Sequence, residues 1–160
     1  MKYFKYPIIL FLSSCFLLSC TPKHNITFLN EISLTPIDDN VFELNKNFKA
    51  FDGHRYYTVP KGFVSDFASI PRILWPAFNP NEMKVIPPAI LHDFMYACPN
   101  DISRAEIDSI FYSALIDNLM NPVKAYAYYI AVRLFGWRYY NKDNHCEFTH
   151  QTTKKVSYKA

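Results

Sequence analysis

Two titratable residues, His92 and Asp93, stand next to each other in an otherwise apolar stretch of the chain. This stretch extends from Val85 to Cys98, and its only other polar side chain is the phenol of Tyr96. Burial of a charge without a partner is costly, so the pair either lies at a solvent-exposed helix edge or is held inside by partners. A buried, partnered histidine beside a carboxylate is suited to acid–base or metal chemistry. The stretch alone leaves both alternatives open.

Asp108 is the first candidate partner of His92. It follows a capping box, Ser103–Glu106, which opens a predicted helix to about Leu119. A short connection joins this helix to the one predicted over 86–98, so the two should pack antiparallel. At a rise of 1.5 Å per residue, His92 and Asp108 lie at similar depth along the pair. A contact between them is therefore geometrically allowed; an acid placed in the first turn by the helix dipole is the alternative.

Two further polar residues are candidates for the same site. Tyr96 follows His92 by four residues and Asp93 by three, so it lies on their side of the helix and its hydroxyl either orients a carboxylate or is half exposed. Asp66 lies in a proline-rich irregular segment. Asp66, Asp93 and loop carbonyls would supply hard oxygen ligands for calcium. A turn-forming Asp66 is the alternative.

Together these residues suggest a hydrolytic mechanism. A neutral His92 accepts a proton from water while Asp108 fixes its tautomer. A metal held by Asp93 and Asp66 stabilises the developing oxyanion.

A serine nucleophile, Ser65 or Ser69, is the alternative to an attacking water. The sequence has no G-x-S-x-G elbow, no Cys/His cluster with zinc spacing, no P-loop and no Rossmann glycine pattern.

The elements that position these residues are predicted from periodicity and turn signals. A hairpin is expected from Val41 to Tyr57, because Asp52-Gly53 is a strong turn signal. Residues 60–88 form an irregular segment, with a short helical turn near 72–75. A third helix is predicted from Asn121-Pro122 to about Tyr140. Its expected core stripe comprises Ala125, Tyr128, Tyr129, Val132, Phe135 and Trp137. The predicted fold is α+β: a small N-terminal antiparallel sheet or hairpin, then a three-helix layer whose antiparallel helix pair carries the site.

The first residues predict export and lipidation. Lys2 and Lys5 precede an apolar segment, 8–18, that is too short to span a bilayer. The segment ends in Leu17-Leu18-Ser19-Cys20, which resembles a bacterial lipobox. Residues 1–19 are then a signal peptide and Cys20 is the lipidated first residue, which anchors the chain in the cell envelope. An ordinary signal peptide is the alternative. Thr21, in place of an Asp, favours the outer membrane over the inner membrane.

The mature chain is predicted to comprise a lipidated cysteine and tether at 20–40, one globular domain at 41–140 and a polar tail at 141–160. Of the 17 Lys and Arg residues, two leave with the signal peptide, which contains no Asp or Glu, so 15 basic residues face 14 acidic ones. This balance argues against nucleic acid as a partner. Cys98 and Cys146 remain as a candidate disulfide in an oxidising periplasm, with two free thiols as the alternative.

Three segments in this order resemble an uncharacterised domain family of phages and bacteria, domain-of-unknown-function family 1353. They are Val59 to Pro71, Ala89 to Tyr96, and Arg104 with Asp108 and Phe111. The resemblance covers roughly Phe42 to Tyr140 and implies no established activity.

The ordered residues also resemble, more weakly, the small prokaryotic and fungal members of the phospholipase A2 superfamily. The resemblance rests on Ser65-Asp66 with a following Ser-Ile-Pro, on His-Asp-x-x-Tyr at 92–96, and on a downstream Asp108. It implies that His92 is the base, that Asp66 and Asp93 bind calcium, that Asp108 partners His92 and that Tyr96 supports Asp108.

Two functions are therefore expected. The first is an envelope-anchored hydrolase, calcium-dependent and acting on phospholipid or on another envelope ester or amide. The second is a non-enzymatic lipoprotein of prophage type that binds or occludes an envelope partner, with the His and Asp residues as a structural polar network.

Overall fold

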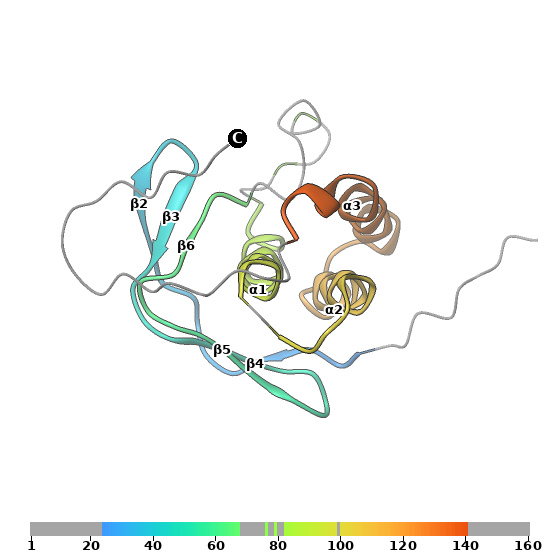
Figure 1. Ribbon diagram of the computed structural model, residues 1–160, viewed down its shortest axis with the longest axis horizontal. Helices are drawn as coiled ribbons and strands as arrows, with labels where there is room; N and C mark the ends of the chain where they lie inside the picture. Colours follow the sequence, from blue (N-terminus) through green and yellow to red (C-terminus); the bar gives the residue numbers. More distant parts are fainter. Residues whose placement is uncertain (1–23, 68–75, 77–78, 80–81, 99, 141–160) are drawn as a thin grey trace, which may run out of the picture.

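The strands of this protein precede its helices along the chain, and the two kinds of element occupy different sides of the molecule (Figure 1). The computed structural model describes residues 24–67, 76, 79, 82–98 and 100–140. Its strands are β1 (Thr27–Phe28), β2 (Leu34–Asp38), β3 (Val41–Leu44), β4 (Phe48–Phe51), β5 (Tyr56–Val59) and β6 (Val64–Ser65). Its helices are α1 (Ile86–Ala97), α2 (Arg104–Asp117) and α3 (Pro122–Phe135), followed by the 3-10 turn η2 (Gly136–Arg138). The predicted α+β class is confirmed.

The strands form two small antiparallel sheets with the orders β1-β4-β5 and β2-β3-β6. The predicted turn at Asp52-Gly53 joins β4 to β5. One carboxylate oxygen of Asp52 accepts hydrogen bonds from the backbone N–H groups of His54 (2.8 Å) and Arg55 (2.6 Å). Gly53 has a φ of 92°, which favours glycine. The hairpin is thus confirmed for β4 and β5, whereas β3 pairs with β2 and β6.

The N-terminal strands tie the start of the described chain to the helices. β1 and β2 lie inside the range 20–40, which the sequence assigned to a lipidated cysteine and a tether. Just before β1, the backbone N–H of Ile26 donates a 2.7 Å hydrogen bond to the carboxylate of Asp117, the last residue of α2. The described chain therefore begins beside the corner between α2 and α3.

Each helix begins at a sequence signal that fixes its first turn. α1 starts with two prolines, Pro87 and Pro88, in its first turn. Ser103 caps α2, because its Oγ accepts a 3.2 Å hydrogen bond from the N–H of Glu106. Asn121 caps α3 in the same way through the N–H groups of Val123 and Lys124. The helices end at residues 97, 117 and 135, so α3 is shorter than predicted.

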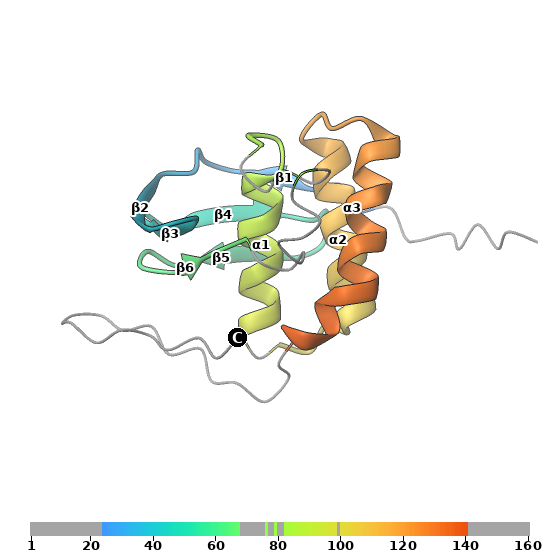
Figure 2. The ribbon, with the colours of Figure 1, turned by 90° about the horizontal axis from the view of Figure 1, so that it is seen from above.

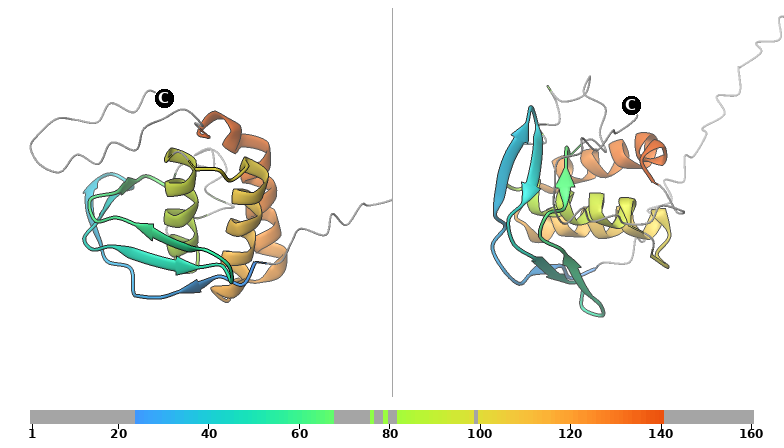
Figure 3. Two further views of the ribbon diagram at one scale, coloured as in Figure 1. Left: turned by 60° about the horizontal axis from the view of Figure 1, so that its bottom comes forward. Right: turned by 60° about the vertical axis from the view of Figure 1, so that its left-hand side comes forward.

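The three helices lie side by side, with the strands next to α1, and β1 and the β4–β5 pair extend past α1 toward α2 (Figures 2 and 3). The core is formed where β3 to β5 meet α1 and where α2 meets its neighbours, and its largest fully buried apolar side chains are Leu44, Phe48, Ile90, Leu91, Ile107, Ile110, Leu115 and Tyr128. One prediction for α3 was wrong. Trp137 was expected in the core stripe but is 59% exposed, because it does not continue the three- and four-residue spacing of Ala125, Tyr128 and Val132. Within the described residues, no helix has both the length and the apolar character needed to cross a bilayer.

Candidate functional site

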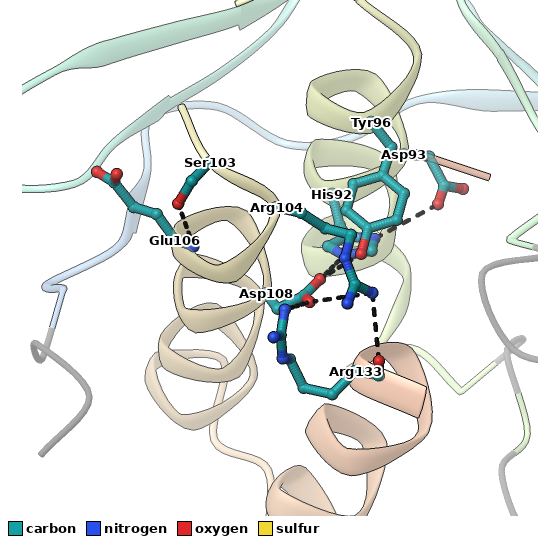
Figure 4. Close-up of polar contacts among 8 residues, drawn as sticks. All are labelled: His92, Asp93, Tyr96, Ser103, Arg104, Glu106, Asp108 and Arg133. Atoms are coloured by element: carbon teal, nitrogen blue, oxygen red, sulfur yellow. Dashed lines mark hydrogen bonds and ion pairs between the residues drawn. The ribbon is translucent and has the colours of Figure 1, made fainter. Parts of the chain in front are cut away.

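The carboxylate of Asp108 is the centre of a polar cluster formed by all three helices (Figure 4). From α1, His92 Nε2 lies 2.9 Å from Asp108 Oδ1, and the hydroxyl of Tyr96 donates a 2.5 Å hydrogen bond to the same oxygen. From α3, Arg133 Nη1 donates a 2.7 Å hydrogen bond to Asp108 Oδ2. Arg104, one turn earlier on α2, places its Nη1 3.9 Å from Asp108 Oδ2 and donates to the backbone carbonyl of Arg133. Asp108 thus joins α1, α2 and α3.

The centre of this cluster is buried. The side chains of His92 and Asp108 are 1% and 0% exposed, whereas those of Arg104 and Arg133 are 24% and 31% exposed. The ring of His92 packs against the rings of Tyr96 and Phe111. A solvent-exposed helix edge is therefore excluded for His92, and the predicted partnered histidine is confirmed. The predicted contact between His92 and Asp108 is confirmed as well.

Asp93 lies on the other side of the His92 ring from Asp108 and faces β6, the strand that pairs with β3. Its Oδ2 accepts a hydrogen bond from the hydroxyl of Ser65 in β6, and its Oδ1 lies 3.8 Å from His92 Nδ1. Its side chain is 14% exposed. The ring of His92 therefore lies between two carboxylates, one on each nitrogen. Ser65, a candidate nucleophile, donates to Asp93 in this arrangement.

The predicted calcium ligands, Asp66 and Asp93, are both described. Asp66 is half-buried and directly follows Ser65, the hydrogen-bond donor to Asp93. Among the described residues, however, no group of three or more His, Cys, Asp or Glu side chains is arranged to hold a metal ion. The described side chains thus do not by themselves fit a calcium site.

The partners of His92 and Asp108 shift the pKa of each. Burial lowers the pKa of His92, but the hydrogen bonds to Asp108 and Asp93 outweigh it and raise the pKa above its usual 6.5. Burial raises the pKa of Asp108, but His92, Tyr96 and Arg133 together bring it below its usual 3.8. Burial and the Asp108 charge raise the pKa of Tyr96, which keeps its hydroxyl protonated as a donor. At neutral pH, the cluster favours a charged Asp108 beside a readily protonated His92.

A family model described as "Protein of unknown function (DUF1353)" matches residues 42–132, which is more than half of the chain. The chain belongs to this family. The match extends from β3 into α3 and contains His92, Asp93, Tyr96 and Asp108, and Arg133 is the residue that directly follows it. The family resemblance noted in the sequence is thereby confirmed. Comparisons with curated proteins and with solved structures found no match.

The shifted pKa values predict how the stability of this DUF1353 domain depends on pH. A raised pKa of His92 stabilises the fold fully below pH 6.5, and this stabilisation is lost as pH rises through the raised value. The lowered pKa of Asp108 stabilises the fold fully above pH 3.8, and this stabilisation is lost as pH falls through the lowered value. We therefore expect the urea midpoint of unfolding to be highest between about pH 4 and 6.5 and to decline on both sides. His92→Gln should remove the decline on the alkaline side, whereas an unchanged profile in that variant would contradict the assignment to His92.

Three residues of the DUF1353 site were not predicted as site residues from the sequence. Arg104 was noted only as part of the family pattern, and neither Arg133 nor Gly136 was predicted to belong to the site. A Cβ added to Gly136 would lie 2.7 Å from the hydroxyl oxygen of Tyr96, so glycine there leaves room for the tyrosine that binds Asp108. The available signal was an arginine in the last turn of a largely apolar helix and a glycine directly after that helix.

Several predicted residues of this DUF1353 protein lie outside the described residues. They are Cys20 with the signal peptide, Ser69, the helical turn near 72–75, Cys146 and the polar tail at 141–160. Cys98, at the end of α1, is disulfide-bonded. Its pairing with Cys146 stays a prediction.

Proposed function

We propose that this DUF1353 protein is a lipoprotein of the bacterial cell envelope that hydrolyses an ester, with phospholipid as the first candidate substrate. One observation carries the catalytic part of the proposal: His92 is held between two carboxylates, with Nε2 on Asp108 and Nδ1 facing Asp93. A histidine whose tautomer and orientation are fixed by a buried carboxylate is the usual arrangement of a general base.

The proposed reaction assigns a separate task to each polar group. Asp108 keeps the proton of neutral His92 on Nε2, and Tyr96 and Arg133 orient Asp108. The attacking water lies on the Nδ1 side and gives its proton to Nδ1, while its oxygen bonds to the carbonyl carbon of the ester. The proton then passes from Nδ1 to the leaving alcohol as the carbon–oxygen bond breaks. Atoms and charge balance without a further reactant.

Burial of His92 determines where a substrate enters. Asp108 lies on one side of the ring and is fully buried, whereas Asp93, on the other side, is 14% exposed. The proposed entrance is therefore beside Asp93 and Ser65. Calcium is proposed as a cofactor from the phospholipase A2 resemblance.

The envelope location is proposed from the sequence motif that ends at Cys20. The lipobox Leu17-Leu18-Ser19-Cys20 supports a lipid anchor, and Thr21 supports the outer membrane. Mass spectrometry of the N-terminal peptide of the protein purified from membranes reports the acylation of Cys20 directly.

We expect His92→Gln to abolish ester hydrolysis without unfolding the domain. The glutamine amide can donate a hydrogen bond to Asp108 in place of Nε2–H, but it cannot take a proton. Loss of a general base lowers the rate by about 10²–10⁴-fold. Turnover of a fluorogenic phospholipid, followed with calcium and with chelator, measures the effect. In the wild type, the rate should rise with pH through the raised pKa of His92, above 6.5, since only the neutral ring accepts a proton.

The matched control is His54→Gln, which changes an exposed histidine in the β4–β5 turn. It should leave turnover unchanged. Retention of turnover in His92→Gln would refute the role of His92. Equal rates with calcium and with chelator would remove calcium from the proposal while leaving the base in place.

A second candidate function is favoured by the complete burial of Asp108 and by its contacts with three helices. Under this alternative, the protein binds or occludes an envelope partner, and the cluster stabilises the helix layer. Absence of turnover by the wild type on phospholipid and on simple esters, across the pH range above, would favour it over hydrolysis.

A further inference from the structure

The solvent-facing side of α3 carries a continuous line of large apolar side chains, which we call the α3 stripe. Its members are Leu119, Val123, Tyr126, Ile130, Leu134 and Trp137, all of them exposed. Val123, Tyr126, Ile130 and Leu134 recur every three or four residues within α3, so these four share one face of the helix. Leu119 precedes α3 in the α2–α3 connection, and Trp137 follows it in η2. Val123 is 79% exposed and Leu134 is 61% exposed, values typical of side chains without a packing partner. Single exposed apolar residues are ordinary, but a contiguous line of them marks an interaction surface.

The charged residues that α3 and η2 themselves contribute are all basic. From 122 to 138 the chain contains Lys124, Arg133 and Arg138 and no Asp or Glu. At 3.6 residues per turn, Lys124 and Arg133 lie on opposite sides of the stripe, where they pair with Glu82 and Asp108.

A basic residue also stands at each end of the α3 stripe. Lys84 Nζ donates a 2.8 Å hydrogen bond to the carbonyl of Leu119, and the guanidinium of Arg138 lies 5.2 Å from the ring centroid of Trp137. Apolar and aromatic residues bordered by Lys and Arg are typical of a helix that lies in the interface of an anionic bilayer.

The start of the described chain lies near one end of this surface. The N–H of Ile26 is bonded to Asp117, two residues before Leu119. From Cys20 to Ile26 the chain can extend at most about 20 Å. A lipid on Cys20 would therefore hold the Leu119 end of the stripe close to the membrane, a step that rests on the lipid anchor proposed above.

We infer that the α3 stripe is the surface by which this domain lies on an anionic lipid bilayer. Apolar side chains enter the acyl boundary, while Lys84 and Arg138 meet the headgroups. Arg133 lies on the same helix and holds Asp108, so the Asp108 side of the polar cluster then faces the helix that contacts the bilayer, whereas the proposed entrance beside Asp93 lies toward β6.

The test uses the full-length chain, purified from membranes and reconstituted into vesicles of phosphatidylcholine with phosphatidylglycerol. The protein has two tryptophans, so Trp75→Phe leaves Trp137 as the only one. Lipids with brominated acyl chains should quench Trp137 emission and shift it to the blue. Leu134→Glu should lose most of this quenching, because it places a charge in the stripe. Ile37→Glu is the matched control, since Ile37 is 50% exposed on β2, and it should keep the quenching.

Mass spectrometry of Cys20 separates this inference from the anchor. Acylated protein whose Trp137 is not quenched would overturn the inference that the α3 stripe contacts the bilayer, while the lipid anchor on Cys20 would stand. Unacylated protein whose Trp137 is quenched would support bilayer contact by the α3 stripe and refute the lipid anchor on Cys20. Unquenched protein that sediments as a dimer, and as a monomer after Leu134→Glu, would overturn the inference by showing that a second copy covers the stripe.

Discussion

Asp108→Ala is expected to lower the free energy of unfolding by about 3–5 kcal/mol, because it leaves buried groups without their shared carboxylate. Tyr96, His92 and Arg133 all direct hydrogen-bond donors at Asp108, whose side chain is fully buried. His92 and Tyr96 would lose their partner in a site with little access to water, whereas Arg133 is 31% exposed. At about 2–4 °C per kcal/mol for a chain of this size, the melting temperature should fall by roughly 6–20 °C. Urea denaturation with circular dichroism measures the change.

Asp101→Ala is the matched control for this prediction. Asp101 also pairs with an arginine, Arg55 at 3.5 Å, but its side chain is 86% exposed. Exposed pairs of this kind contribute about 0–1 kcal/mol. Asp108→Asn should fall between the two, because the amide keeps some hydrogen bonds and removes the charge. If Asp108→Ala were as stable as Asp101→Ala, the cluster would not hold the helices together.

Gly136→Ala is expected to destabilise the domain by about 2 kcal/mol although it adds a single methyl group. The added Cβ would lie 2.7 Å from the hydroxyl oxygen of Tyr96 and 3.1 Å from its Cε2. The backbone itself would tolerate alanine, because Gly136 has a φ of −64°. Replacing glycine at such a site normally stabilises the fold by about 0.4–1 kcal/mol, because it lowers the conformational entropy of the unfolded chain. This gain is smaller than the cost of moving the buried Tyr96 away from the Asp108 carboxylate.

Tyr96→Phe provides the test of this cause. Without the hydroxyl, the closest contact of the new methyl group disappears, so Gly136→Ala should cost less in the Tyr96→Phe background. Contacting residues show coupling of about 0.5–3 kcal/mol in such a cycle. Gly53→Ala is the control for glycine removal at another position, because a Cβ added at Gly53 would meet no neighbouring atom. The φ of 92° makes alanine unfavourable there, and the resulting loss of stability should be similar with Tyr96 and with Tyr96→Phe. Equal costs of Gly136→Ala in both backgrounds would disprove the contact.

The contact between His92 and Asp108 could be predicted because local signals fix the first two helices. Two prolines open α1, a capping box opens α2, and the short connection between them makes the pair antiparallel. The depth of each residue then follows from the helical rise, and Tyr96 follows from its four-residue spacing to His92.

Arg133 could not be predicted in the same way. The sequence indicates which face of α3 is apolar, but the rotation of α3 against α2 is set by packing of side chains that are distant in sequence. The pairing of β3 with β6, which places Phe42 opposite Ser65, is also non-local, whereas β2 and β3 form a local hairpin. The hydrophobicity of Trp137 suggested a core position, but Trp137 does not follow the spacing of the buried residues of α3 and is exposed.

The hydrogen bond from Ile26 to Asp117 has a consequence for biosynthesis. It joins residues that are 91 positions apart, and it closes the first strand of the domain onto the second helix. A chain that emerges N-terminus first lacks this contact until residue 117 has been made, and contacts of such long sequence separation form slowly. The contact between the start of the described chain and α2 therefore forms only after most of the domain has been synthesised, whereas the pairing of β1 with β4 needs residues only up to Phe51.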